Sequence, residues 1–251
     1  MSFSQNIMGV DIKMIPRKLK DIDVLLLAGG LGTRLHYMSN KVPKVLASIH
    51  GKPFLELLID NLVKQGFRRI IICVGYLKDQ VIEHFLHRDD CQIIFSEEEN
   101  PLGTGGAVKN ARNLIASPVF ITLNGDSFCD INYSEFYNFH ITNNSFMTIV
   151  LTSFPITEQK EYGSITLSDT NRIIRFKEKT TQGFNSKINS GIYLMTNDIF
   201  HSMPDKSSFS LEEDLFPKLL DNNCFGYVCD KELFDIGTPE RLNRSIETLT
   251  K

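Results

Sequence analysis

A glycine-rich segment near the N-terminus, residues 27–35, contains the first residues whose types and spacing could do chemistry. Glycines let backbone N–H groups approach an anion closely, because no side chain stands in the way. Arg34 within the segment and Lys44 beyond it supply positive charge where a triphosphate would lie. The segment has neither the G-K-[ST] of a Walker loop nor the G-x-G-x-x-G of a dinucleotide fold. A structural turn with a solvated arginine is the alternative, but the longer string with both cations favours phosphate binding.

Two aspartates far apart in the sequence could hold a divalent cation. Asp126 follows Gly125 at the end of a predicted buried strand, where the ligand sites of parallel sheets collect. A cap on the turn or on the following helix explains Asp126 equally well. Asp235 is flanked by apolar residues in a predicted strand, and a carboxylate there needs a partner, such as a metal. Thr238 and Pro239, just beyond it, are typical of a helix start.

The composition argues against several classes of protein. The formal net charge of -3 does not favour binding to nucleic acid. The five cysteines are dispersed without a C-x-x-C pair, which favours a reducing compartment over a disulfide framework or a zinc site. No apolar stretch reaches the length of a membrane span, and no signal-peptide core precedes the first strand. We therefore expect a cytoplasmic protein that has no membrane or nucleic-acid partner.

The elements that must position these residues follow from the hydrophobic pattern. Apolar runs at 24–27, 70–74 and 119–123 predict buried strands, and 92–95 predicts a short strand. These strands alternate with helices predicted from Pro53 onward, at 77–86 and at 106–115. Beyond about residue 130, strands are predicted at 147–152, 164–167, 172–176 and 191–195, and helices at 211–220 and 239–249. The pattern predicts an α/β fold with a Rossmann-like, mixed, mostly parallel sheet and helices on both faces. We expect residues 1–22 to form an N-terminal extension and residues 23–251 to form one domain.

These motifs together resemble a known family. Residues 29–35, then Pro43-Lys44, then residues 51–53 are similar to the N-terminal signature of the sugar-phosphate nucleotidyltransferases, and the match continues from Val24 through most of the chain. The resemblance implies the nucleotide-diphospho-sugar transferase type of fold. It also implies transfer of a nucleoside monophosphate from an NTP to a sugar 1-phosphate, with release of pyrophosphate.

The resemblance also assigns roles to residues. It places Arg34 and Lys44 on phosphates and gives Asp126 and Asp235 the role of Mg²⁺ ligands. The nucleotide contacts of the first loop would come from Leu27, Ala28, Gly29, Gly30, Gly32 and Thr33. A sugar 1-phosphate is already an oxyanion nucleophile, so no Ser, Cys or His need be activated. The cation and the two basic side chains would then act by positioning and by stabilising charge.

A second glycine-rich segment, residues 101–107, resembles the second nucleotide loop of the family and implies contacts from Gly103 and Thr104. It could instead be only a helix entry. Three glutamates precede it, and a carboxylate can accept both the N1–H and the N2–H of guanine. We expect Glu98 to play this part, which favours GTP; a solvated acidic patch is the alternative. The sugar-phosphate contacts implied by the resemblance are Asn124, Gly163, Glu178, Lys179 and Asn189.

Among the subfamilies, the chain looks closest to the D-glycero-D-manno-heptose 1-phosphate guanylyltransferases, although mannose- and muramic-acid-type enzymes share much of the pattern. Many relatives have Gly or Ala where Ser190 stands, which bears on the fit around the sugar. A hexose 1-phosphate with GTP or UTP is the alternative substrate pair. A catalytically silent, nucleotide-sugar-binding subunit is a further alternative, and the presence of all four charged residues, Arg34, Lys44, Asp126 and Asp235, speaks against it. A homodimer is left open.

Overall fold

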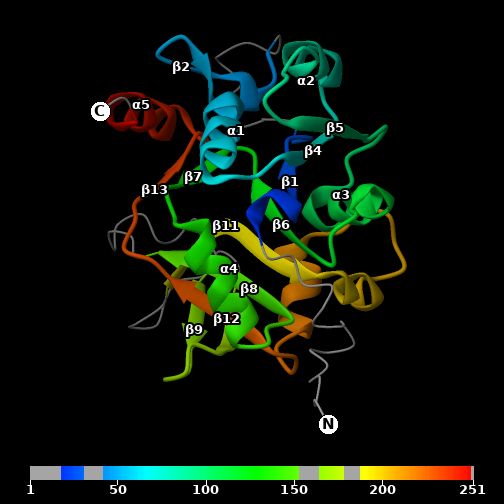
Figure 1. Ribbon diagram of the computed structural model, residues 1–251, viewed down its shortest axis with the longest axis vertical. Coiled ribbons are helices and arrows are strands. Elements are labelled where there is room, and N and C mark those ends of the chain that lie inside the picture. Colours follow the sequence, from blue (N-terminus) through cyan, green and yellow to red (C-terminus); the bar gives the residue numbers. More distant parts are fainter. Residues whose placement is uncertain (1–17, 31–41, 153–163, 178–186, 250–251) are drawn as a thin grey trace.

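A computed structural model describes residues 18–30, 42–152, 164–177 and 187–249 of the 251-residue chain (Figure 1). Its main sheet has nine strands, with the order β10-β9-β11-β6-β1-β4-β5, and β8 joins β12 to β11. The strands of the first half are β1 (Asp23–Leu27), β4 (Arg69–Val74), β5 (Gln92–Glu97) and β6 (Val119–Asn124). They pair only in parallel with one another. The predicted Rossmann-like α/β sheet is thereby confirmed.

The second half of the chain extends this sheet with mixed pairing. Its strands are β8 (Met147–Thr152), β9 (Ser164–Leu167), β10 (Ile173–Lys177), β11 (Lys187–Thr196) and β12 (Cys224–Val228). Strand β11 runs antiparallel to β6 and β8, and its register with β8 shifts between Asn189 and Tyr193. Gly191, inside this bulge, has a φ of 76°, a left-handed conformation that suits glycine.

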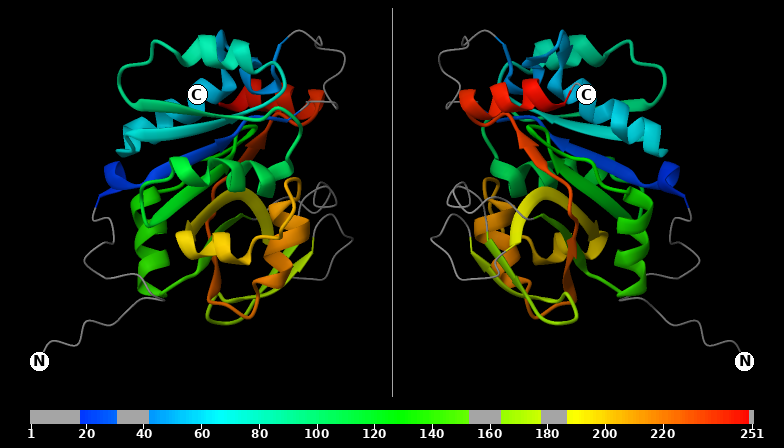
Figure 2. Two further views of the ribbon diagram at one scale, coloured as in Figure 1. Left: turned by 90° about the vertical axis from the view of Figure 1, so that its right-hand side faces the viewer. Right: turned by 90° about the vertical axis from the view of Figure 1, so that its left-hand side faces the viewer.

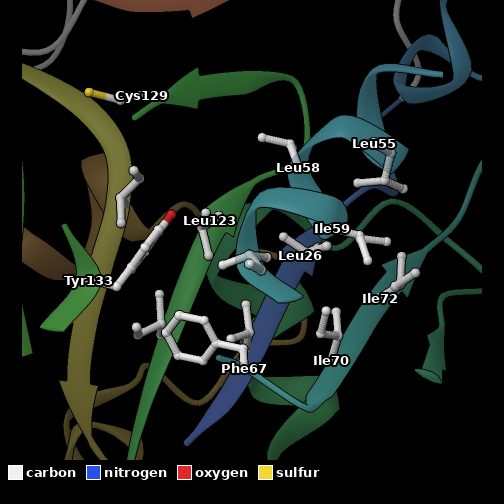
Figure 3. Close-up of a cluster of buried hydrophobic side chains, with 14 of the residues drawn as sticks. Leu26, Leu55, Leu58, Ile59, Phe67, Ile70, Ile72, Leu123, Cys129 and Tyr133 are labelled. Atoms are coloured by element: carbon white, nitrogen blue, oxygen red, sulfur yellow. The ribbon is translucent and has the colours of Figure 1, made fainter. Parts of the chain in front are cut away.

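Helices cover both faces of the parallel strands (Figures 1 and 2). The helices are α1 (Phe54–Gln65), α2 (Lys78–Phe85), α3 (Gly103–Asn110), α4 (Tyr133–Thr142) and α5 (Pro239–Thr248). Alternate residues of β1 face opposite sides, so Leu26 packs with α1 whereas Leu25 packs with α3. Figure 3 shows the α1 side, where Leu55, Leu58 and Ile59 lie over the strands. The expected α1 stop is present, because Gly66 ends the helix with a φ of 111°.

Two short ribbons and two 3₁₀ turns complete the frame. The pair β7 (Ser127–Cys129) and β13 (Leu233–Asp235) is antiparallel, as is the pair β2 (Ser48–Ile49) and β3 (Lys52–Pro53). Lys44–Leu46 is a 3₁₀ turn between β1 and β2. Near the start of the described chain, Leu19–Asp21 is another 3₁₀ turn, and Leu19 packs into the core on the α1 side.

Two helix predictions differ from the structure. The helix expected at 106–115 already begins at Gly103 and ends as a 3₁₀ turn, Ala111–Leu114. The helix expected at 211–220 is a π-helical turn, Leu211–Leu215, followed by a 3₁₀ turn, Phe216–Lys218. Pro217 accounts for the second difference, because its missing N–H prevents a continuous α-helical ladder.

Candidate active site

A pocket of about 400 Å³ opens at the carboxyl ends of β1 and β6. These strands are parallel neighbours, so the residues that follow them meet at one edge of the sheet. The pocket joins that edge to the loop before α3. It is lined by Leu27, Ala28, Gly29, Gly30, Lys44, Val45, Glu98, Pro101, Leu102, Gly103, Thr104, Ala107, Asn124 and Asp126. All of these except Val45, Pro101, Leu102 and Ala107 were predicted as site residues. The predicted residues Gly32, Thr33, Arg34, Gly163, Glu178 and Lys179 lie outside the described part of the chain.

Lys44 and Asp126 form an ion pair in this pocket. Lys44 follows Pro43 and begins the 3₁₀ turn, and its Nζ lies 2.5 Å from Asp126 Oδ2. The Lys44 side chain is only 11% exposed, so solvent screens this pair less than it screens a surface pair. The helix-cap explanation for Asp126 is wrong, because Asn132 caps α4 through hydrogen bonds to two backbone N–H groups.

Asp235 lies beside Asp126 because β13 pairs with β7. The register places Asp235 opposite Ser127, and the Ile236 N–H donates to the Asp126 carbonyl over 3.0 Å. Asp235 is buried, and its Oδ1 accepts from the Gly237 N–H at 2.8 Å and from Arg241 Nη1 at 3.4 Å. The buried carboxylate therefore has protein partners, and sequence reasoning missed Arg241 among them.

Gly237 marks the point where these charged groups converge. A Cβ at this position would lie 2.7 Å from Asp235 Oδ1 and 3.8 Å from Lys44 Nζ. Asp235 is not among the residues that line the 400 Å³ pocket. Thr238 caps α5 and Pro239 is its first residue, as predicted.

The donor chemistry of the two aspartates fits a magnesium ion. Mg²⁺ in phosphate-transfer sites takes one or two carboxylates and completes its shell with phosphate oxygens and water. Asp126 and Asp235 supply two such carboxylates from adjacent backbone positions. Within the described ranges, no three His, Cys, Asp or Glu side chains cluster as a metal site. A cation held by this pair would therefore depend on oxygens from the substrates.

Two glycines of the second glycine-rich segment, which were not predicted as site residues, bond to the protein backbone. The Gly105 and Gly106 N–H groups donate to the Phe209 carbonyl at 2.9 and 3.2 Å, so they face the protein and not a phosphate. A Cβ on Gly105 would lie 2.2 Å from the Phe209 ring. These two glycines let the segment around Phe209 pack against α3. Gly103 and Thr104, which are predicted to contact the nucleotide, line the pocket.

Glu98 lies at the wall between two pockets. It lines the 400 Å³ pocket and a neighbouring one of about 160 Å³, and Gly29 and Pro101 line both as well. Glu98 is 8% exposed, and a Cβ on Gly29 would lie 3.0 Å from its Oε1. Burial raises the pKa of this carboxyl, an effect that the hydrogen bond from the Leu102 N–H opposes. The solvated-patch explanation suits Glu97, whose 52% exposed side chain pairs with Lys78, but it does not suit Glu98.

The predicted sugar contacts Asn124 and Asn189 meet at Gly191. A Cβ on Gly191 would lie 2.5 Å from Asn124 Nδ2, and the Gly191 N–H donates to Asn189 Oδ1 at 3.0 Å. Ser190 faces away from them, because it is 2% exposed and its hydroxyl donates to the Val150 carbonyl at 2.9 Å. The serine that departs from the family pattern is thus accommodated within the sheet.

Comparison with known proteins places this arrangement in a family. The family model described as "Nucleotidyl transferase" matches residues 23–251. The chain belongs to the nucleotidyl transferase family. The predicted class of enzyme, a sugar-1-phosphate nucleotidyltransferase, is confirmed by this match and by guanylyltransferases among its relatives. In the described part of the chain, no helix is long and apolar enough to cross a membrane.

Two relatives and one solved structure match over nearly their whole length. The D-glycero-alpha-D-manno-heptose 1-phosphate guanylyltransferase of Campylobacter jejuni is 36% identical over 227 residues, covering 87% of this chain and 96% of that protein. Its namesake from Aneurinibacillus thermoaerophilus is 32% identical, covering 91% and 98%. HddC from Yersinia pseudotuberculosis has a TM-score of 0.80 at 35% identity, covering 91% of this chain and 100% of that one. That protein has also been crystallised in a complex with GMP-PN.

Proposed function

We propose that the protein transfers GMP from GTP to a D-glycero-D-manno-heptose 1-phosphate and releases pyrophosphate. The observation that carries this proposal is the convergence of Lys44, Asp126 and Asp235 beside a pocket at the strand ends. The choice of heptose and GTP draws support from the two relatives of that specificity, which align over nearly their full length.

In this reaction, a phosphate oxygen of the sugar 1-phosphate attacks the α-phosphorus of GTP, and the bond to the β-phosphate oxygen breaks. The chain has to bring two anions together and to stabilise the charge that develops on the departing pyrophosphate. Lys44 is held for this by Asp126, so its ammonium group is ordered before a phosphate arrives. Arg34 would add a second positive charge, as the family resemblance implies. Asp126 and Asp235 would hold Mg²⁺, which supplies positive charge to the phosphate oxygens when bound.

We assign the choice of base to Glu98. A carboxylate offers two oxygens, so it can accept the guanine N1–H and N2–H together. Glu98 is the buried member of the three glutamates and lies in the wall that both pockets share. The sugar 1-phosphate would lie near Asn124 and Asn189, which converge at Gly191.

A substrate panel tests this proposal. GTP, UTP and ATP are each offered with heptose, mannose and glucose 1-phosphates, and pyrophosphate release is recorded with product masses. We expect the highest kcat/KM for GTP with heptose 1-phosphate, and loss of turnover in EDTA. Faster turnover of mannose 1-phosphate would make the protein a hexose 1-phosphate enzyme. If no substrate pair releases pyrophosphate but the protein binds a nucleotide sugar, the result would favour a catalytically silent subunit.

The cellular setting belongs to the same proposal. We place the enzyme in the cytoplasm, where nucleoside triphosphates are made and where its five free cysteines stay reduced. A homodimer stays a prediction, which light scattering of the purified protein measures directly.

A further inference from the structure

Glu212 connects the nucleotide side of the site to the sugar side. It lies in the π-helical turn Leu211–Leu215, a kind of turn that is rare and that often occurs at functional sites. Its Oε2 accepts from Thr104 Oγ1 at 2.6 Å and from Ser210 Oγ at 2.8 Å. Its Oε1 accepts from the Tyr193 hydroxyl at 2.9 Å. No motif in the sequence singled out this residue.

The direction of each hydrogen bond on the sugar side is fixed by chemistry. The Gly191 N–H can only donate, so the atom of Asn189 that it meets at 3.0 Å is the amide oxygen. The Asn189 NH₂ group therefore points to the Tyr193 hydroxyl, at 2.9 Å, and donates to it. Tyr193 in turn directs its own proton to Glu212. The carboxylate thus fixes the direction of the Tyr193 hydroxyl, which together with the Gly191 N–H holds the Asn189 amide in place.

On the nucleotide side, the hydrogen bonds are likewise directed toward Glu212. The Leu211 N–H donates to Thr104 Oγ1 at 2.9 Å, so the Thr104 hydroxyl gives its proton to Glu212. Thr104 lines the 400 Å³ pocket, whereas Asn189 lies beside Gly191 on β11. The Glu212 carboxylate accepts from the Thr104 hydroxyl on the nucleotide arm and from the Tyr193 hydroxyl on the sugar arm. An ionised carboxylate only accepts hydrogen bonds, as this pattern requires.

Packing keeps this network rigid. Tyr193 is fully buried, and its ring centroid lies 5.0 Å from that of Phe216 in an edge-on contact. The Phe209 backbone carbonyl accepts from the first turn of α3, which ties the segment before Glu212 to the loop that carries Thr104. Neither arm can shift without breaking a hydrogen bond at the carboxylate.

We propose that Glu212 is a positioning residue that holds Thr104 in the wall of the nucleotide pocket and, through Tyr193, holds Asn189 beside the sugar 1-phosphate. The inference rests on the proposed function, because that function assigns the sugar 1-phosphate to Asn189. Beyond that function, the inference is that one side chain, Glu212, orders contact residues for both substrates without touching either substrate.

Separate KM values for the two substrates test the inference. Tyr193→Phe removes only the hydroxyl and keeps the ring against Phe216. It should raise the KM for the sugar 1-phosphate about tenfold and leave that for GTP near wild type, because one hydrogen bond of ordinary strength is lost on one arm. Glu212→Gln replaces one acceptor oxygen with an NH₂ group and removes the negative charge that strengthens the hydrogen bonds from Thr104 and Tyr193, so it should raise both KM values.

The neighbouring Glu213 provides a matched control. It lies in the same turn and is exposed, so Glu213→Gln should leave both KM values unchanged. In the double variant with Tyr193→Phe, Glu212→Gln should add nothing to the KM for the sugar 1-phosphate but should still raise the KM for GTP. A structural role alone would lower the melting temperature and kcat without separating the two KM values.

Failure of the inference and failure of the proposed function give different results. The wild-type protein on the substrate panel tests the function, and the comparison of variants then uses whichever sugar 1-phosphate is turned over. A Tyr193→Phe variant with a wild-type KM for that sugar 1-phosphate would overturn the inference. So would a rise in both KM values from Tyr193→Phe alone, since the inference connects the tyrosine hydroxyl to the sugar 1-phosphate through Asn189.

Discussion

The substitution Glu98→Gln removes one negative charge from the wall between the two pockets and leaves the shape of the side chain unchanged. Glu98 has one hydrogen bond from the described backbone, the Leu102 N–H at 3.3 Å, and a glutamine carbonyl can keep it. The other carboxylate oxygen, Oε1, faces Gly29, and a Cβ on Gly29 would lie 3.0 Å from it. The perturbation therefore acts on what binds beside Gly29 more than on the surrounding fold.

The expected magnitude follows from the number of donors that guanine offers. Hydrogen bonds to a charged group contribute about 1.5–3 kcal/mol, which corresponds to roughly tenfold to a hundredfold in kcat/KM. Glutamine can accept one guanine N–H, but its NH₂ group opposes the other. We expect kcat/KM for GTP to fall within that range and kcat/KM for UTP to change little. The GTP/UTP ratio should narrow accordingly, and pyrophosphate release with each nucleotide measures it.

The pKa of Glu98 adds a second readout. Burial raises this pKa, so lowering the pH protonates Glu98 at a higher pH than an ordinary glutamate. The wild-type GTP/UTP ratio should therefore decline as the pH falls, whereas the ratio for Glu98→Gln should not respond. The folded carboxyl binds its proton more tightly than the unfolded one, so its ionisation lowers stability as the pH rises through the folded pKa. Glu98→Gln should accordingly melt no lower than wild type at neutral pH.

Glu97→Gln is the matched control for this experiment. Glu97 is the preceding residue and is also a glutamate, but it is 52% exposed and pairs with Lys78 at 2.7 Å. It should leave the GTP/UTP ratio unchanged. An unchanged ratio in Glu98→Gln would remove Glu98 from the base site and leave Glu99 or the backbone of residues 28–30 as the reader of the base.

Three further predictions concern the metal site, a buried histidine and a thiol. Asp126→Asn and Asp235→Asn should each lower turnover by about a hundredfold or more while the protein still folds, because the side-chain volume is kept; the melting temperature should fall somewhat, since Lys44 or Arg241 loses its charged partner. A wild-type rate at saturating Mg²⁺ would exclude that residue as a ligand. Burial lowers the pKa of His140 from 6.5 to about 3, so the unfolded state binds more protons between these values. The free energy of unfolding should therefore fall by about 1.4 kcal/mol per pH unit as the pH drops below 6.5, and urea titrations of wild type and His140→Gln should differ by this slope. The pKa of Cys229 is lowered to about 7, chiefly by its hydrogen bond with Cys129. Iodoacetamide at pH 7 should therefore label Cys229 first, as peptide mass mapping would record, and Cys129→Ser should slow that labelling.

The strands of the parallel half could be predicted because burial on both faces leaves continuous apolar runs. Strands β8 and β9 also have the bounds expected from the sequence. Helix α4, in contrast, was missed, although its signals are present. Asn132 is its N-cap and bonds the Glu135 side chain at 2.9 Å, while Tyr133, Phe136, Tyr137 and His140 are buried at helical spacing. Its aromatic residues, which have high β-propensity, obscured the periodicity.

The site residues fall into two groups with different predictability. Residues after β1 and β6 could be predicted, because neighbouring parallel strands end at one edge and a local motif then identifies the site. Arg241, Tyr193 and Glu212 could not, because they act through hydrogen bonds between elements far apart in the sequence. The contact of Gly105 and Gly106 with the Phe209 backbone could not be predicted either, because Phe209 is about a hundred residues away in the sequence.

The placement of Asp235 shows how much of the site depends on one short ribbon. Side chains alternate along a strand, so a slip of one residue between β7 and β13 would turn Asp235 to the other face. Three-residue strands cannot fix their register alone, and two contacts from outside the ladder supply it. The Ile236 N–H bonds the Asp126 carbonyl at 3.0 Å, and the Ser245 hydroxyl of α5 bonds the Asp235 carbonyl at 3.2 Å. Helix α5 thus contributes to the site by holding the backbone of Asp235 beside that of Asp126.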